Sequence, residues 1–156
     1  MTPGIKVAVS AGIAHQIHQY SHDPKAESYG AEAAEKLGLP PQRVFKTLVL
    51  ALDTGELVVA VVPVSGMVIF KALAWAAGAK KAAMAEAGAV SRSTGYVLGG
   101  VSPLGQKKAL RTFIDESAQG FDSIFVSAGR RGLEIELAAA DLAALCRGSF
   151  AAIAQD

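Results

Sequence analysis

Several features that mark particular classes of protein are scarce or missing in this sequence. Its 156 residues include one cysteine, Cys146, so no disulfide can form within the chain. Lys and Arg number 15 against 14 Asp and Glu, without the basic surplus of a protein that holds long nucleic acid by its backbone. The apolar run at residues 57–62 is too short to cross a bilayer, and residues 1–6 do not begin a secretory signal. The sequence therefore predicts a cytoplasmic protein that does not enter a membrane.

Common catalytic and metal-binding signatures are also missing. No Gly-x-Ser-x-Gly places a serine on a nucleophile elbow, and the chain has neither a Walker loop nor a dinucleotide fingerprint. His15, His18 and His22 lack the cysteine or carboxylate cluster that completes a zinc site, and a strand would point His15 and His18 to opposite faces. Cys146 lies among leucines and alanines, which favours helix packing over nucleophilic attack. We expect no metal and no cofactor.

The apolar content, in contrast, is high. It reaches 51% of the chain, which suits one domain, residues 1–156, with a single core. Two apolar runs, residues 44–52 and 57–62, flank the turn 53–55 and are expected to form a β-hairpin. Apolar and polar residues do not alternate along either run, so both faces should be covered, as at the centre of a sheet or in a small barrel. Periodicity and capping residues together predict an α+β fold, with helices at residues 3–11, 30–37, 70–77, 85–91 and 138–146, and strands at 14–20, 44–52, 57–62, 110–114, 123–127, 133–137 and 150–153.

Lys46 is a charged residue on an apolar strand. Period-two geometry places it on the same face as Val44 and Leu48. Burying an ammonium there is costly unless an anion or a water-filled cleft receives it. One interpretation is a lysine near the strand's end whose head reaches into water. The other is a cation aimed into a pocket, where it would hold a phosphate.

Two glycine-rich segments and the paired basic residues complete the candidates. Residues 95–105 carry four glycines and a proline; such a loop can bring backbone amides close to an oxyanion or a carbonyl, or can be purely structural. Residues 127–132, SAGRRG, are expected to form a glycine turn between two strands, either a simple hairpin turn or a rim that meets RNA phosphates. The pairs 80–81, 107–108 and 130–131 are basic, which fits either solvated surface or a local RNA contact.

Motifs along nearly the whole chain, in order, resemble those of one family, the cysteinyl-tRNA(Pro) deacylases of the YbaK type. Residues 99–103 also fit the G-x-x-x-P pattern of bacterial prolyl-tRNA synthetase editing domains. The segments that carry the resemblance are Thr2-Pro3, Tyr20-x-His22-Asp23-Pro24, residues 30–38, Phe45-Lys46-Thr47-Leu48, Ser93-Thr94-Gly95-Tyr96, residues 99–108 (GGVSPLGQKK) and Arg131-Gly132-Leu133.

The resemblance implies a fold and an activity. The fold would be a curved, largely antiparallel or mixed β-sheet or barrel flanked by helices. The activity would be trans-editing: removal of cysteine from mischarged tRNA(Pro), beside prolyl-tRNA synthetase as a partner. It further implies that the substrate's own thiol attacks its carbonyl and releases the tRNA through a cyclic thiolactone. A chain with one cysteine is compatible with a thiol supplied by the substrate.

Residue roles follow from the same resemblance. Lys46 matches the family's lysine, which positions the terminal adenosine and its phosphate, and backbone amides near Gly100 are expected to stabilise the carbonyl oxygen. Glu136 matches an acidic position near the site. The other implied pocket residues are Tyr20, Tyr29, Thr47, Gly99, Ser102, Pro103 and Gly129, and the candidates for RNA contact are Lys107, Lys108, Arg130 and Arg131.

The sequence departs from the family pattern at three positions. Ala128 stands where relatives often have a second glycine, Ala139 where many have proline, and Tyr29 where phenylalanine is common. Two alternatives also stay open: a related deacylase for alanyl- or another small aminoacyl-tRNA, and a non-catalytic module that binds tRNA or the synthetase. Retention of both Lys46 and the glycine loop weighs against the second alternative.

Overall fold

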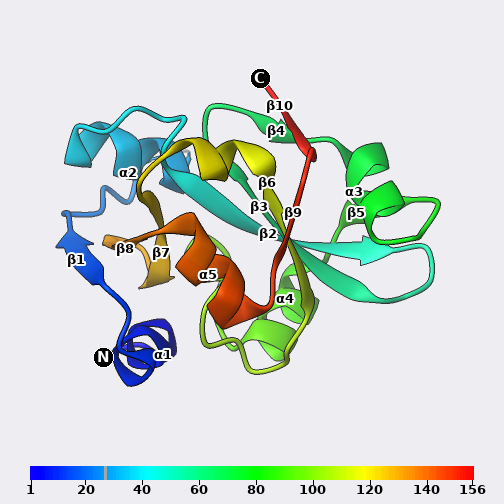
Figure 1. Cartoon of the computed structure of the whole chain (residues 1–156), viewed down its shortest axis with the longest axis horizontal. Helices are drawn as coiled ribbons and strands as arrows, with labels where there is room; N and C mark the ends of the chain where they lie inside the picture. Colours follow the sequence, from blue (N-terminus) through cyan, green and yellow to red (C-terminus); the bar gives the residue numbers. More distant parts are fainter. Residues whose placement is uncertain (27) are drawn as a thin grey trace.

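The computed structural model describes residues 1–26 and 28–156 and has the expected α+β composition (Figure 1). In the described residues, no helix has the length and apolar character that a membrane span requires. The helices are α1 (Pro3–Ala11), α2 (Tyr29–Leu37), α3 (Phe70–Ala76), α4 (Ala87–Thr94) and α5 (Ala139–Cys146), with a short 3-10 helix, η1 (Glu116–Gly120). The strands are β1 (His15–Gln19), β2 (Phe45–Leu52), β3 (Leu57–Pro63), β4 (Met67–Val68), β5 (Ala82–Met84), β6 (Arg111–Asp115), β7 (Ile124–Arg130), β8 (Leu133–Leu137), β9 (Ser149–Ala151) and β10 (Ala154–Gln155).

Two main sheets form the centre of the molecule. The five-stranded sheet has the order β5-β2-β3-β6-β9 and is mixed, because β2 runs antiparallel to both neighbours while β6 runs parallel to both of its own. The three-stranded sheet, β1-β8-β7, is antiparallel throughout. A parallel bridge from Val44 to Phe125 joins the start of β2 to β7. The predicted class, α+β with mixed sheets flanked by helices, is confirmed.

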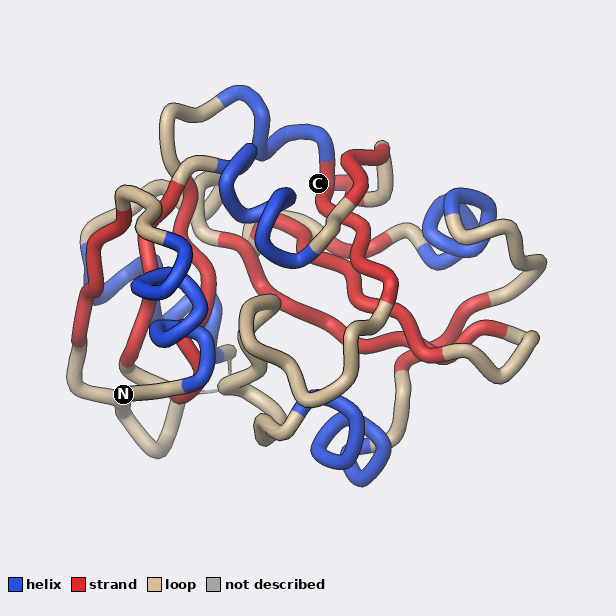
Figure 2. Tube along the Cα trace, turned by 60° about the horizontal axis from the view of Figure 1, so that its bottom comes forward, coloured by secondary structure: helices blue, strands red, loops and turns tan. Residues whose placement is uncertain are grey.

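Both faces of the hairpin β2–β3 are covered. On one face, Phe45, Val49 and Val61 pack into a core shared with the three-stranded sheet, α1 and α5. On the other face, Leu50 and Val62 belong to a second cluster that includes residues of α3. Figure 2 shows strands running through the middle of the molecule with helices on several sides of them, while other strands lie at its edges. Burial on both faces explains why these strands are apolar at nearly every position.

The helix boundaries follow from local capping. Thr2 precedes α1, where its hydroxyl accepts a hydrogen bond from the Ile5 amide at 3.3 Å, and Ser28 caps α2 in the same way through the Ala31 amide at 3.4 Å. The Thr2 hydroxyl also donates to the Ala128 carbonyl, which ties the start of α1 to β7. These contacts position α1 against β7 and the start of α2 beside the hairpin.

Most predicted bounds agree with the structure to within one residue, and the larger differences concern a helix, a strand and a turn. The helix expected at residues 85–91 is α4, Ala87–Thr94. The strand expected at residues 150–153 ends at Ala151, after which a separate short strand, β10, pairs with β4. The glycine turn expected at residues 127–132 is partly strand: β7 continues to Arg130, with a register irregularity after Ser127 that the positive φ of Gly129 permits. Strands β4, β5 and β10 are two or three residues long, too short to leave a period in the sequence.

Candidate functional site

A cavity of about 390 Å³ opens where β2, the start of α2, the glycine loop and the β7–β8 hairpin meet. Backbone pairing brings these distant segments together, since β2 is joined to β7 by the Val44–Phe125 bridge. The lining residues are Tyr20, Ser28, Tyr29, Gly30, Phe45, Lys46, Thr47, Leu48, Leu98, Gly99, Val101, Ser127, Arg130, Arg131 and Glu134.

Strand β2 contributes two polar groups, on Lys46 and Thr47, that have no partner among the described residues. Burial lowers the pKa of Lys46 below its ordinary value, and none of the described carboxylates forms an ion pair with its ammonium. The hydroxyl of Thr47 is buried and makes no hydrogen bond within the described part of the chain. Buried polar groups are normally satisfied, so this hydroxyl, on a residue that lines the cavity, is a candidate partner for a ligand atom.

The carboxyl group in the cavity is Glu134, not the Glu136 implied by the resemblance. Glu134 is only 6% exposed, and burial raises the pKa of its carboxyl to about 8. It is therefore mostly protonated at neutral pH and able to donate a hydrogen bond. Leu133, Ile135 and Leu137 fill the core on the opposite face of β8, as the alternation predicts.

Glu136 is part of a separate network away from the cavity. It accepts from His18 at 2.9 Å, from Arg43 at 3.2 Å and from the Ser123 hydroxyl at 2.5 Å. Burial raises the pKa of Glu136, but these hydrogen bonds and charges outweigh it and leave the pKa below its usual value. Residues i and i+2 of a strand share a face, so the sequence could not distinguish which of the two acids reaches the cavity.

Gly99 brings the glycine loop into close contact with the mouth of the cavity. Its φ is +88°, and a Cβ at this position would lie 2.4 Å from Cε2 of Tyr29 and 2.8 Å from Nε of Arg131. Only glycine fits both the backbone conformation and the space. Gly99 and Val101 line the cavity, and the hydrogen bonds found among the described residues use neither of their amides.

Gly100, which follows Gly99 in the loop, is not among the residues that line the cavity. Its amide donates to the Val97 carbonyl at 3.0 Å, within the turn, and is therefore already occupied. A Cβ on Gly100 would lie 2.9 Å from the Cα of Arg130, so this glycine is required for the loop to lie against the backbone of β7. Its role here is close packing, and the amides of Gly99 and Val101 are the better candidates for contact with a substrate.

Three other expected pocket residues do not line the cavity. Ser102 is fully buried, and its hydroxyl accepts from the Leu104 amide at 3.2 Å. Pro103 follows it in the interior. Gly129 lies against Thr2 and Tyr96, where a Cβ would approach Cε1 of Tyr96 to 2.8 Å. These residues pack the glycine loop and β7 against the start of α1, since a Cβ on Gly4 would lie 3.1 Å from the Ser102 hydroxyl and one on Gly129 would lie 3.0 Å from Cβ of Thr2.

The remaining predicted positions fall into two groups. Tyr20, Tyr29, Arg130 and Arg131 line the cavity, and burial raises the pKa of the Tyr20 hydroxyl. Lys107 and Lys108 are exposed beyond α4 and are not among the lining residues. Of the three departures from the family pattern, Ala128 and Ala139 lie in the main core, and only Tyr29 lies at the cavity.

A hydrogen-bonded chain at the mouth was not anticipated from the sequence. The Arg131 guanidinium lies 3.4 Å from the centroid of the Tyr29 ring, and its Nη1 is 3.1 Å from Nε2 of His22. Nδ1 of His22 is 2.7 Å from the carboxylate of Glu32, which also accepts from the Asp23 amide at 2.7 Å. His22 and Glu32 stood in two separate family motifs, which was the available signal, but nothing local connects them to Arg131.

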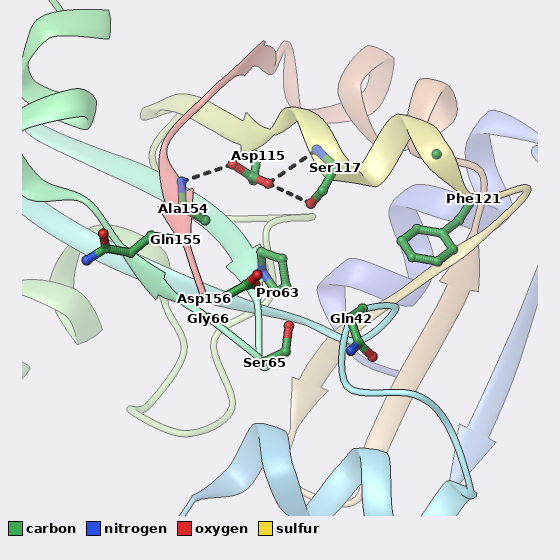
Figure 3. Close-up of a pocket in the computed structure, with 11 residues that line it drawn as sticks. Gln42, Pro63, Ser65, Gly66, Asp115, Ser117, Phe121, Ala154, Gln155 and Asp156 are labelled. Atoms are coloured by element: carbon green, nitrogen blue, oxygen red, sulfur yellow. Dashed lines mark hydrogen bonds between the residues drawn. The ribbon is translucent and has the colours of Figure 1, made fainter.

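The second cavity, of about 340 Å³, has less to offer a ligand (Figure 3). Its buried carboxylate, Asp115, accepts from the amides of Ile153 and Ala154 and from both the amide and the hydroxyl of Ser117. These bonds tie the end of the chain to β6 and leave Asp115 satisfied. Cys146 is not a candidate nucleophile either, since burial raises the pKa of its thiol to about 11. The described residues contain no group of three or more His, Cys, Asp or Glu that could hold a metal ion.

Comparison with known proteins gives consistent matches. The model of the aminoacyl-tRNA editing domain family matches residues 23–145. A protein of Enterococcus faecalis (strain ATCC 700802 / V583), EbsC, named as a Cys-tRNA(Pro)/Cys-tRNA(Cys) deacylase, is 44% identical over 120 residues, which are 77% of this chain and 73% of that protein.

Solved structures share the fold. One, described as a trans-editing enzyme for prolyl-tRNA synthetase, has a TM-score of 0.85 at 19% identity and covers 100% of this chain and 99% of its own. Another, described only as a hypothetical protein, has a TM-score of 0.87 at 21% identity, over 99% of this chain and 100% of that one.

Proposed function

Because this chain belongs to the family of aminoacyl-tRNA editing domains, we propose that it is a deacylase that cleaves the ester of mischarged cysteinyl-tRNA(Pro) in trans. Its 44% identity to a protein named as a Cys-tRNA deacylase supports that choice of aminoacyl group. One structural observation carries the proposal: Lys46, Thr47 and the loop residues Gly99 and Val101 all line one cavity, and the Thr47 hydroxyl has no partner among the described residues.

The cavity suits the acceptor end of a charged tRNA. Its volume of about 390 Å³ lies within the range of small-molecule sites. The Lys46 ammonium, without a carboxylate partner among the described residues, is available for the phosphate of the terminal nucleotide. The Thr47 hydroxyl next to it would satisfy its hydrogen bond on the same nucleotide. Recognition of the whole tRNA by long basic surfaces is not required by this arrangement.

The chemistry follows from the substrate. The cysteine thiol attacks its own ester carbonyl, forming the carbon–sulfur bond of a thiolactone. The bond from the carbonyl carbon to the ribose oxygen breaks, and the thiol's proton goes to that oxygen, which leaves as the free hydroxyl of the tRNA. The protein needs only to orient the ester and stabilise the developing negative charge. We assign the second task to the amides of Gly99 and Val101, since that of Gly100 is already bonded.

Glu134 is assigned to the amino-acid end of the substrate. As a mostly protonated carboxyl at neutral pH, Glu134 can donate a hydrogen bond to the aminoacyl group. If the substrate's amino group is cationic, its charge would lower the pKa of Glu134 and favour the carboxylate. The absence of a reactive protein thiol fits attack by the substrate, because burial keeps Cys146 in the thiol form. Action on mischarged tRNA beside prolyl-tRNA synthetase would place the protein in the cytoplasm.

The test is a deacylation assay on Cys-tRNA(Pro), Cys-tRNA(Cys), Ser-tRNA(Pro) and Ala-tRNA(Pro), each with and without prolyl-tRNA synthetase. We expect rapid loss of cysteine and slow loss of serine, since a hydroxyl is a far poorer nucleophile than a thiol. Equal rates for cysteine and serine would contradict assistance by the substrate thiol. If Ala-tRNA(Pro) were deacylated fastest, the substrate would be reassigned to alanyl-tRNA. If the protein bound tRNA without deacylating any of the four, it would be a non-catalytic module that recruits tRNA.

A further inference from the structure

The mouth of the cavity contains an arginine, Arg131, whose position is set by three neighbours. Arg131 lies over the face of Tyr29 at 3.4 Å, and the backbone of Gly99 lies so close that a Cβ there would be 2.8 Å from Nε of Arg131. The third constraint is the hydrogen bond between Arg131 and His22, two residues 109 positions apart in the chain. A guanidinium held on three sides loses little freedom when it binds a ligand.

The partners of His22 determine which ring nitrogen carries the proton. The guanidinium of Arg131 can only donate, so Nε2 of His22 must accept. The ionised carboxylate of Glu32 can only accept, so Nδ1 of His22 must donate. Burial raises the pKa of Glu32, but the hydrogen bonds from His22 and Asp23 outweigh it and leave the pKa below its usual value, which keeps this carboxylate ionised. His22 therefore connects a buried anion to a cation at the mouth of the cavity as a neutral Nδ1–H imidazole.

The surroundings of His22 support this assignment. The side chain of Glu32 is only 4% exposed. Its other carboxylate oxygen, Oε2, lies 3.5 Å from the ammonium of Lys36. The backbone amide of Asp23 donates to Glu32. The ring centroids of Tyr29 and His22 are 6.0 Å apart in an edge-on arrangement. Of these groups, Arg131 is the cation that faces Nε2, so a proton on that nitrogen would set two donors and two positive charges against each other.

We propose that His22 is a positioning residue, which as the Nδ1–H tautomer holds Arg131 over Tyr29 so that the guanidinium binds a backbone phosphate of the tRNA acceptor end. Lys46 and Arg131 both line the cavity, and together they would hold the strand at two points. The identity of the ligand rests on the proposed function, whereas the tautomer and the orientation of Arg131 do not. His22 acts through Arg131 and touches no reacting atom.

The first experiment reads the tautomer directly, by long-range ¹⁵N–¹H NMR of the histidine rings at about pH 8, above the ordinary titration range of histidine. We expect a protonated Nδ1 and an unprotonated Nε2 for His22, assigned with the His22→Gln variant. His18 is an internal comparison, because its Nε2 faces the carboxylate of Glu136 and should carry the proton. A protonated Nε2 on His22, or rapid exchange between tautomers, would overturn the proposal.

The second experiment is a double-mutant cycle on the deacylation of Cys-tRNA(Pro). His22→Ala should raise KM by about tenfold with little change in kcat, the effect of losing one charge-assisted hydrogen bond. His22→Gln, which keeps a donor and an acceptor in a neutral group, should restore most of the affinity. Arg131→Ala should raise KM further and reduce the salt dependence of binding by about one counterion. In the Arg131→Ala background, His22→Ala should then have no further effect.

His15→Gln is the matched control, since His15 bonds only the Ile13 carbonyl in the described structure and does not line the cavity. An equal loss from His22→Ala with and without Arg131 would show that His22 acts otherwise. Thermal melts of each variant separate a folding defect from this outcome. If the wild-type protein does not deacylate any tRNA while the NMR result holds, the proposed function fails and the positioning role of His22 survives.

Discussion

Replacing Glu134 by glutamine should remove a loss of stability that the wild-type protein undergoes as the pH rises. In the unfolded chain this carboxyl has the ordinary pKa of 4.5, and in the folded protein burial raises the pKa to about 8. As pH rises above 4.5, the unfolded state loses the proton and the folded state retains it. The native state therefore becomes progressively less stable until the pH reaches about 8.

The magnitude follows from the two pKa values. Each pH unit inside the window costs about 1.4 kcal/mol, and the ends of the window contribute less. Between roughly pH 5 and pH 7 the wild-type protein should lose about 2.5 kcal/mol of unfolding free energy relative to Glu134→Gln, whose amide does not titrate. The amide keeps the size of the side chain and avoids the buried charge, so the variant should be the more stable protein at neutral pH.

Urea unfolding at a series of pH values measures this difference, with other titrating groups cancelling between wild type and variant. Glu136→Gln is the matched control on the same strand. The folded-state pKa of Glu136 is lowered, so its contribution is present above the ordinary pKa of 4.5 and is lost as the pH falls below it. That variant should parallel the wild type between roughly pH 5 and pH 7. If Glu134→Gln does the same, Glu134 is well solvated and the assignment of a protonated carboxyl to the cavity is wrong.

Further predictions concern the cavity walls and the cysteine. Lys46→Ala should lower kcat/KM for Cys-tRNA(Pro) by at least about 100-fold while unfolding at a similar urea concentration, because a cavity cation without a described partner contributes to binding rather than to folding; a wild-type rate would remove this lysine from the site. Thr47→Val should stabilise the protein by about 1 kcal/mol in urea unfolding, since it removes a buried unpaired hydroxyl, and should still weaken substrate binding; loss of stability would indicate a partner for that hydroxyl. Gly99→Ala should destabilise the fold by about 1–3 kcal/mol and raise KM, because a Cβ would lie 2.4 Å from Tyr29 at a φ of +88°; unchanged values in both assays would show that the loop moves freely. Cys146→Ala should leave the deacylation rate unchanged, as its thiol pKa of about 11 implies, and a lost rate in a folded variant would contradict attack by the substrate's thiol.

Local signals in the sequence were sufficient for much of the fold. Thr2 caps α1 as its side chain and the following proline predict, and the hairpin 44–62 forms where two β-rich runs flank a turn. Lys46 was also identifiable, because a charge within an apolar strand is costly wherever it is placed, and it does line a cavity with the glycine loop. Each of these features depends on residues close together in the chain.

Tertiary structure decided what the sequence left ambiguous. Glu134 and Glu136 share a strand face, and only the packing of α2, β2 and the glycine loop over that face determines which acid is enclosed. The Gly100 amide is consumed by its own turn, and Ser102 and Gly129 face α1, although all three lie in or near glycine-rich segments. The contact between His22 and Arg131 joins residues 109 positions apart and has no local pattern. Spacing along a chain reports helix and strand periods, whereas the neighbours of a side chain across a cavity depend on how separate elements pack.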